Sequence, residues 1–155
     1  MTKIETISII HQPPKVLLGM KKVRFGKGKY NGFGGSIENG ESLERCAIRE
    51  TEEEAGITIV NPQRVGRILF HFETNEQDHL VHFFRASEFY GIPIESDEMK
   101  PEWFNTNNIP YEQMWPDDKY WLPILLRGKL FQGEFKFDLE GRIAKYELNE
   151  VNNLD

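Results

Sequence analysis

Several features are scarce or missing in this 155-residue chain. It has a single cysteine, Cys46, so no disulfide can form within the chain and nothing indicates an oxidising compartment. No apolar run approaches the roughly 20 residues that a membrane-spanning helix needs. The first residues also lack the apolar core of a secretory signal. We therefore expect a cytoplasmic protein with no membrane partner.

An excess of positive charge is also missing, because 19 basic residues face 25 acidic ones and the net charge is −6. Proteins that bind nucleic-acid polymers usually carry basic surfaces, so we expect no such partner. The charge is unevenly placed: residues 1–37 hold seven basic residues and one acidic residue, whereas residues 38–54 hold seven glutamates. A basic segment followed by an acidic one could bind a phosphate chain at the basic side and a divalent metal at the acidic side. Two solvated surfaces of opposite charge would give the same sequence pattern.

The hydrophobic pattern predicts one domain over residues 1–155, with an α+β fold, since strands surround an early helix and a second helix comes late. Expected strands are Ile4–Ile10, Val65–Phe72, Leu80–Ala86, Leu130–Phe137 and Arg142–Leu148. Lys15–Met20 is a further short apolar run, and Trp103–Phe104 begins another short ordered piece. A basic loop (Lys21–Lys29) and a polar loop (Glu73–Asp78) separate some of them. Expected helices are Ser42–Ala55 and Asp117–Arg127, and Pro123 should kink the second or delay its start. We expect the tail Asn149–Asp155 to fray.

The first predicted helix carries an unusual set of carboxylates. Its apolar ladder of Leu43, Cys46 and Ala47 is continued at helical spacing by Glu50, Glu53 and Glu54. Three carboxylates on a partly buried edge are costly unless a cation compensates them, and Mg²⁺ prefers oxygen ligands. The alternative is an ordinary solvated acidic helix whose glutamates pair with neighbouring arginines.

Residues 35–57 resemble the Nudix box, a 23-residue motif of glycine, glutamate and arginine at fixed spacing. Matching positions are Gly35, Glu41, Arg49, Glu50, Glu53, Glu54, Gly56 and Ile57, whereas Thr51 stands where an aliphatic residue is usual. The resemblance implies a Nudix α/β/α sandwich around a mixed sheet. It also implies a pyrophosphohydrolase that uses Mg²⁺, or Mn²⁺ in its place.

Further segments look like those of the animal-type oxidised purine nucleoside triphosphate hydrolases within that family. They are Val16–Lys22, Asn31–Gly35, Glu95–Met99, Trp115–Asp118 and Gly133–Phe137. The likeness implies an enzyme that converts 8-oxo-dGTP and 2-hydroxy-dATP to the monophosphate and pyrophosphate, which sanitises the nucleotide pool. Nothing in the sequence demands more than a monomer, so we expect one. Two alternatives stay open. One is another nucleotide substrate, such as O6-methyl-dGTP, ADP-ribose or a dinucleoside polyphosphate, and the other is a non-catalytic nucleotide-binding module.

The resemblance also assigns roles to residues. Glu50, Glu53 and Glu54 would hold the metal together with Glu98 and a backbone carbonyl near Gly34. Arg49 would hold these glutamates in place, and Glu53 or Glu54 would activate the attacking water. Substrate would be bound by Thr6, Lys21, Phe25, Asn31, Phe33, Gly34, Gly35, Phe70, Phe72, Met99, Trp115, Asp117, Asp118, Trp121 and Phe137.

The adjacent pair Asp117 and Asp118 has two interpretations. It could cap the second helix, or it could read the base, because two neighbouring carboxyls in an apolar pocket raise the pKa of one of them. One carboxyl would then donate a hydrogen bond while the other accepts one. Tyr30, Ser36 and His79 depart from the residues usual in the family.

Overall fold

In the computed structural model, which describes residues 1–74 and 77–155, the long strand β1 (Thr2–Gln12) organises the main sheet. One edge of β1 pairs in parallel with β7 (Asp78–Ala86). Its other edge is shared. Residues 5–8 pair antiparallel with β4 (Phe33–Ser36), and residues 10–12 pair with β2 (Lys15–Lys21).

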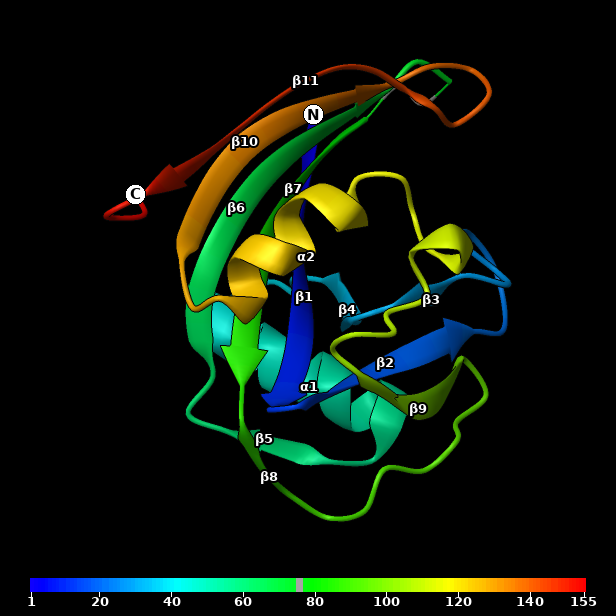
Figure 1. Ribbon diagram of the computed structural model, residues 1–155, viewed down its shortest axis with the longest axis vertical. Helices are drawn as coiled ribbons and strands as arrows, with labels where there is room; N and C mark the ends of the chain where they lie inside the picture. Colours follow the sequence, from blue (N-terminus) through cyan, green and yellow to red (C-terminus); the bar gives the residue numbers. More distant parts are fainter. Residues whose placement is uncertain (75–76) are drawn as a thin grey trace.

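Seven further strands complete the sheets in the described part of the chain. Beyond β7 follow β6 (Gln63–Phe72), β10 (Leu130–Phe137) and β11 (Ile143–Val151), and on the far side β2 pairs with β3 (Tyr30–Asn31) and β9 (Met99–Asn105). A separate ribbon joins β5 (Thr58–Val60) to β8 (Glu88–Tyr90). Because β6 and β10 are parallel while their neighbours are antiparallel, the sheet is mixed (Figure 1).

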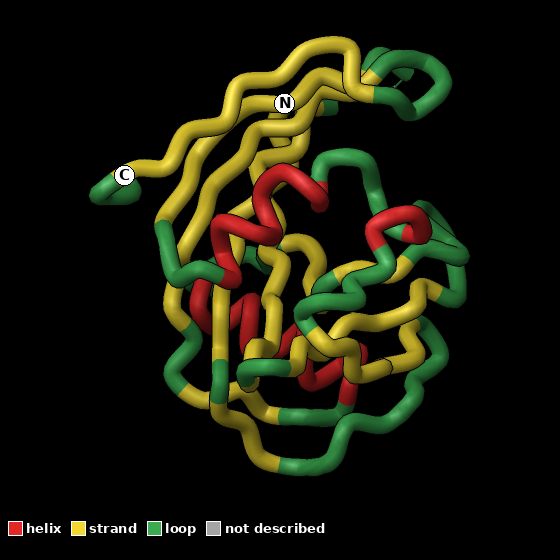
Figure 2. Tube along the Cα trace, viewed as in Figure 1, coloured by secondary structure: helices red, strands yellow, loops and turns green. Residues whose placement is uncertain are grey.

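Two helices cover opposite faces of this sheet (Figures 1 and 2). Helix α1 (Leu43–Ala55) packs Ala47 and Ala55 into a core with Ile10 and Phe84. Helix α2 (Asp118–Leu126) packs Trp121, Leu122 and Leu125 into a second core, which includes Phe83, Phe131 and Phe135. The expected Nudix sandwich is therefore confirmed.

The boundaries of α1 follow from local chemistry. Ser42 accepts a hydrogen bond from the backbone N–H of Arg45 at 3.1 Å, and Gly56 ends the helix in the left-handed conformation with φ of 72°. These caps place the helix at residues 43–55, as predicted. Its inner edge then lies under β4 and β1, which positions its carboxylates.

The predicted long strands are confirmed, and the structure corrects two details of the second half, namely the frayed tail and the late start that was one of two expected effects of Pro123. Residues 149–151 do not fray, because they pair with residues 130–132 of β10. The start of α2 is not delayed by Pro123, since the helix already begins at Asp118. The short elements β3, β4, β5, β8 and a 3₁₀ turn (Tyr111–Gln113) were not predicted. Of the predicted polar loop, residues 75–76 lie outside the described residues.

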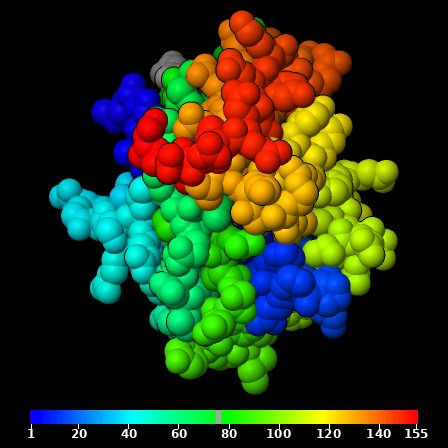
Figure 3. Space-filling model, turned by 60° about the vertical axis from the view of Figure 1, so that its left-hand side comes forward, coloured from blue at the N-terminus to red at the C-terminus, as the bar shows by residue number. Residues whose placement is uncertain are grey.

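The loop before α1 and the last strands are prominent on the molecular surface. In Figure 3 the loop before α1, in cyan, protrudes from the body of the molecule, and its residues 38–40 are exposed. The last strands, in orange and red, cross the upper part of the same view. Within the described residues, no helix is long and apolar enough to cross a membrane.

A buried histidine in β7 should make the stability of the fold sensitive to acid. His82 is 7% exposed, and its Nδ1 lies 2.9 Å from Nη1 of Arg64. Burial, followed by the charges of Arg64 and Arg67, lowers the pKa of His82 from 6.5 to about 4. Since the folded pKa is the lower one, the stability from neutral His82 is complete above pH 6.5 and is lost as the pH falls toward 4.

We predict that His82→Gln removes this contribution to the pH dependence. Between pH 7 and pH 4.5, wild-type protein should lose roughly 2–3 kcal/mol more unfolding free energy than the variant. Urea denaturation at the two pH values measures this difference. Equal losses in both proteins would contradict the assignment.

Candidate active site

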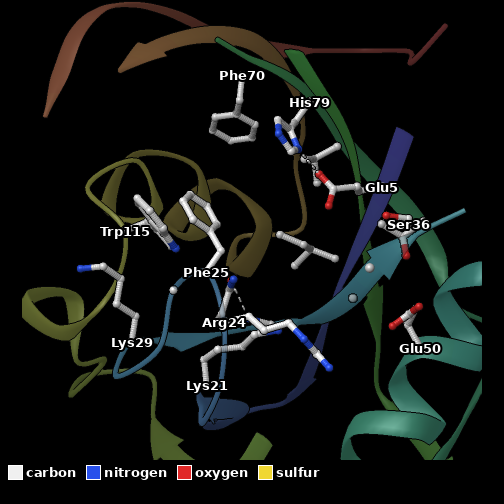
Figure 4. A pocket seen from close by; sticks show the side chains of 18 of the residues that line it. Glu5, Lys21, Arg24, Phe25, Lys29, Ser36, Glu50, Phe70, His79 and Trp115 are labelled. Atoms are coloured by element: carbon white, nitrogen blue, oxygen red, sulfur yellow. Dashed lines mark hydrogen bonds and ion pairs between the residues drawn. The ribbon is translucent and has the colours of Figure 1, made fainter. Parts of the chain in front are cut away.

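A cavity of about 640 Å³ opens beside β1, between the loop 22–29 and the edge of α1 (Figure 4). Strands β1, β4, β6, β7 and β10 supply its walls, together with residues from the start of α2 and the inner edge of α1. The cavity has two chemically different ends. One is aromatic with buried carboxyls, and the other combines glycines with glutamates.

Aromatic rings form the walls of the first end. The rings of Phe72 and Phe137 are parallel within 8°, with centroids 5.2 Å apart. Trp115 meets both rings edge-on, and Phe25 stacks on Trp115 at 5.0 Å. Phe25 is 68% exposed, so it lies at the mouth of the cavity and not at its buried end. Flat apolar walls of this kind suit a planar ring system.

Asp117 and Asp118 lie in this aromatic end and are 5% and 3% exposed. Trp121 donates a hydrogen bond from Nε1 to Oδ2 of Asp117 at 2.8 Å, and Asp117 makes no side-chain bond that caps α2. The capping interpretation is therefore not what the structure shows. Oδ2 of Asp118 is buried and has no hydrogen-bond partner among the described residues.

Burial raises the pKa of both carboxyls, and the neighbouring charge of Asp117 holds the pKa of Asp118 well above its ordinary value. Two ionised carboxylates in contact would repel each other without water to screen them. Burial and mutual repulsion therefore both favour the form of the pair that shares one proton, with one hydroxyl donor beside one acceptor.

The second end is built around the close approach of β4 to β1. A Cβ at Gly34 would lie 1.7 Å from the carbonyl oxygen of Thr6, so only glycine fits there. This approach points the N–H of Gly34 at Oε1 of Glu54, at 2.8 Å. Next to it, a Cβ at Gly35 would lie 2.5 Å from Oε2 of Glu50. The two glycines thus leave room for both carboxylates against the backbone.

The three helix glutamates differ in burial. Glu54 is 3% exposed, and burial raises its pKa to about 8, although Lys21 Nζ lies 3.9 Å from Oε2. The Glu50 side chain is 14% exposed, whereas that of Glu53 is 57% exposed. The prediction that all three share a buried edge is therefore wrong for Glu53, which reaches the cavity from its rim.

Arg49 connects these glutamates to the rest of the site. Its Nε lies 2.7 Å from Glu41, its Nη1 lies 2.8 Å from Glu50 and 3.3 Å from Glu53, and its Nη2 donates to the carbonyl of Ser36 at 3.1 Å. The guanidinium lowers the pKa of Glu41 to about 2. Arg49 is thus a positioning residue that holds the carboxyl groups of Glu50 and Glu53 next to its guanidinium.

The donor set fits an oxygen-ligated divalent cation, although no such site is fully assembled. Among the described residues, no three acidic, histidine or cysteine side chains converge closely enough to hold a metal. Arg49 explains this for Glu50 and Glu53, and Arg24 holds Glu98 at 2.8 Å. The buried carboxylate of Glu54 accepts one backbone hydrogen bond, from Gly34, and its ammonium neighbour Lys21 lies 3.9 Å away, so it is the group that a cation would compensate.

The structure brings most of the predicted site residues to this one cavity. These are Thr6, Lys21, Phe25, Asn31, Gly34, Gly35, Glu50, Glu53, Glu54, Phe70, Phe72, Glu98, Met99, Trp115, Asp117, Asp118 and Phe137. Phe33 and Trp121 are not part of its lining, and Arg49 contacts the glutamates from outside the cavity. Phe33 is fully buried in the core beneath α1, and Trp121 reaches the cavity only through its bond to Asp117.

Sequence reasoning missed Glu5 and Ile7, which line the cavity from β1. A signal for Glu5 was present, because it is the only acidic residue among the first 37 and sits within a strand. An isolated charge in a central strand needs a partner or a ligand.

Residues 2–151 match the NUDIX domain family, so the chain belongs to the Nudix family, and it is a Nudix hydrolase. It is 47% identical over 155 residues to the oxidized purine nucleoside triphosphate hydrolase of Danio rerio, with 99% of this chain and 98% of that protein covered. The protein of that name from Mus musculus is 44% identical over 152 residues, covering 98% and 97%. Among solved structures, a MutT protein from Bacillus halodurans superposes with a TM-score of 0.85 at 28% identity, covering 95% and 97%.

The raised pKa of Asp118 carries a prediction about stability. A folded pKa above the unfolded value of 3.8 means that stability is lost as the pH rises past 3.8 toward the folded pKa. Asp118→Asn keeps the shape of the side chain but cannot ionise. We expect the variant to be at least as stable as wild type at pH 7, with an advantage that grows from pH 5 to pH 8. Denaturant titrations across this range measure it, and a variant that loses more than about 1 kcal/mol at pH 8 would contradict it.

Proposed function

We propose that the protein hydrolyses oxidised purine nucleoside triphosphates, with 8-oxo-dGTP and 2-hydroxy-dATP as substrates, to the nucleoside monophosphate and pyrophosphate. The observation that carries the proposal is that one cavity joins an aromatic end, which holds a buried carboxyl pair with raised pKa values, to a glutamate and glycine end. The names of the full-length relatives from Danio rerio and Mus musculus support the same substrate class. The cellular role would be to remove damaged nucleotides before a polymerase uses them.

Base recognition would take place at the aromatic end. Phe72, Trp115 and Phe137 offer ring faces and edges to a purine. Asp117 and Asp118 present one hydroxyl donor and one acceptor to its polar edge. Oxidation of a purine changes its pattern of donors and acceptors, and a carboxyl pair can shift its proton to match. This freedom would let one pocket accept both oxidised purines.

The phosphates would lie at the other end, between Lys21 and the glutamates. We propose Mg²⁺, or Mn²⁺ in its place, as the cofactor, held by Glu50, Glu53, Glu54, Glu98 and the carbonyl of Gly34. When bound, the ion would neutralise phosphate charge and make a coordinated water more acidic.

The chain's own residues would perform the remaining steps. The ammonium of Lys21 attracts a phosphate oxygen and lies 3.9 Å from Glu54. Glu53 or Glu54 accepts the proton of the attacking water, while Arg49 keeps the helix carboxylates in register. Attack at the anhydride phosphorus forms one P–O bond and breaks another, and pyrophosphate departs. We further propose that residues 1–155 act as a single domain, as a monomer and in the cytoplasm.

Steady-state kinetics with Mg²⁺ on 8-oxo-dGTP, 2-hydroxy-dATP, dGTP and ADP-ribose test the proposal. Wild-type protein should favour the two oxidised triphosphates. Glu54→Gln should lower kcat on them by about a thousandfold, since general-base catalysis contributes about 10²–10⁴, while nucleotide binding survives. Glu52→Gln, an exposed residue on the same helix, is the matched control and should keep wild-type kcat. A preference for ADP-ribose, or turnover that survives in both Glu53→Gln and Glu54→Gln, would overturn the proposal.

The carboxyl pair gives a separate prediction about specificity. Asp117→Asn or Asp118→Asn should lower kcat/KM for oxidised purines by about tenfold or more, since a lost hydrogen bond to a charged group costs about 1.5–3 kcal/mol. Unchanged kcat/KM in both variants would remove the pair from base recognition.

A further inference from the structure

Glu5 and His79 form a hydrogen-bonded pair on the wall of the cavity (Figure 4). His79 Nδ1 and Glu5 Oε1 are 2.6 Å apart, and the two side chains come from the paired strands β7 and β1. Their side chains are 16% and 22% exposed, so both are largely shielded from bulk water. The pair has no part in the base or phosphate contacts described above.

The pair lies along the wall that runs between the two ends of the cavity. His79 meets the ring of Phe72 edge-on at 5.4 Å, which places it beside the aromatic end. Glu5 pairs in register with Ser36, the residue after Gly35, which places it beside the glycine end. In any nucleotide the sugar connects the base to the phosphates. A nucleotide that spans the cavity therefore brings its sugar toward Glu5.

The chemistry of the pair suits sugar hydroxyls better than phosphate. An ionised carboxylate only accepts hydrogen bonds, and it repels an anionic phosphate. It can accept from both hydroxyls of a vicinal diol, and a carboxylate is the usual partner of the ribose 2′-hydroxyl in dinucleotide-binding folds. Lys3 Nζ lies 3.9 Å from Oε2 of Glu5, and His79 Nδ1 contacts Oε1, so both oxygens of the carboxyl group have a nitrogen neighbour at the cavity wall.

We propose that Glu5, oriented by His79, accepts hydrogen bonds from the sugar hydroxyls of the substrate, so that the protein prefers ribonucleoside to 2′-deoxyribonucleoside triphosphates. This inference rests on the function proposed above and specifies the sugar within that substrate class. Glu5 contacts the substrate, whereas His79 is a positioning residue that acts through Glu5. A deoxyribonucleotide keeps one of the two contacts and loses the other.

The test compares 8-oxo-GTP, 8-oxo-dGTP and the 2′,3′-dideoxy analogue as substrates of wild-type protein and Glu5→Gln. In wild type, kcat/KM should fall about tenfold from the ribo to the deoxy substrate, because about 1.4 kcal/mol is a factor of ten, and again for the dideoxy analogue. Glu5→Gln should reduce the ribo-to-deoxy ratio to within about twofold, because a neutral amide oxygen accepts more weakly than a carboxylate. His79→Leu, which keeps an apolar contact with Phe72, should lower the ratio part of the way.

Glu134→Gln is the matched control, because Glu134 pairs with His71 at 2.9 Å in the same chemical arrangement but outside the cavity. It should keep the wild-type sugar ratio. Thermal melts of all variants identify any that fail to fold, and the sugar ratio is a readout that a purely structural role would not change. Equal kcat/KM for ribo and deoxy substrates in wild type, or an unchanged ratio in Glu5→Gln, would overturn the inference alone. Absence of turnover on every oxidised purine would overturn the proposed function as well.

Discussion

The hydrogen bond from the Gly34 N–H to the buried carboxylate of Glu54 links the sheet to helix α1, and the geometry of the site depends on it. It requires β4 to lie so close to β1 that no Cβ fits at Gly34. It also requires α1 to be capped at residues 42 and 56, because a shift of one residue would turn Glu54 away. The carboxylate is thereby held in a dry place where it stays available to a cation.

Much of this arrangement could be predicted from local sequence. The helix caps, the long alternating strands and the spacing of the glutamates are short-range signals, and they predicted α1 at its observed boundaries. The solvent exposure of the Glu53 side chain could not be predicted in this way. Its exposure depends on Arg49, which reaches Glu41 and the carbonyl of Ser36 and draws the carboxylates outward. Such a network is set by tertiary packing and not by helical periodicity.

The aromatic end shows a similar limit. Phe25, Phe72, Trp115 and Phe137 come from four separate segments, and only the fold brings their rings together. Resemblance to a family predicted most of these residues, but it also placed Phe33 and Trp121 in the pocket, where packing puts them behind the wall. The short strands β3 and β4 were missed because glycine-rich segments carry little hydrophobic pattern.

The parallel pairing of β1 with β7 has a consequence for biogenesis. Thr2 lies opposite Asp78 and Ile10 lies opposite Ala86, so β1 cannot complete its pairing with β7 until the residues between the two strands have been synthesised. β10 must likewise return to β6 from far along the chain. Folding dominated by such distant pairings is slow. The apolar side of β1 therefore lacks its β7 neighbour for as long as this intervening part of the chain is incomplete.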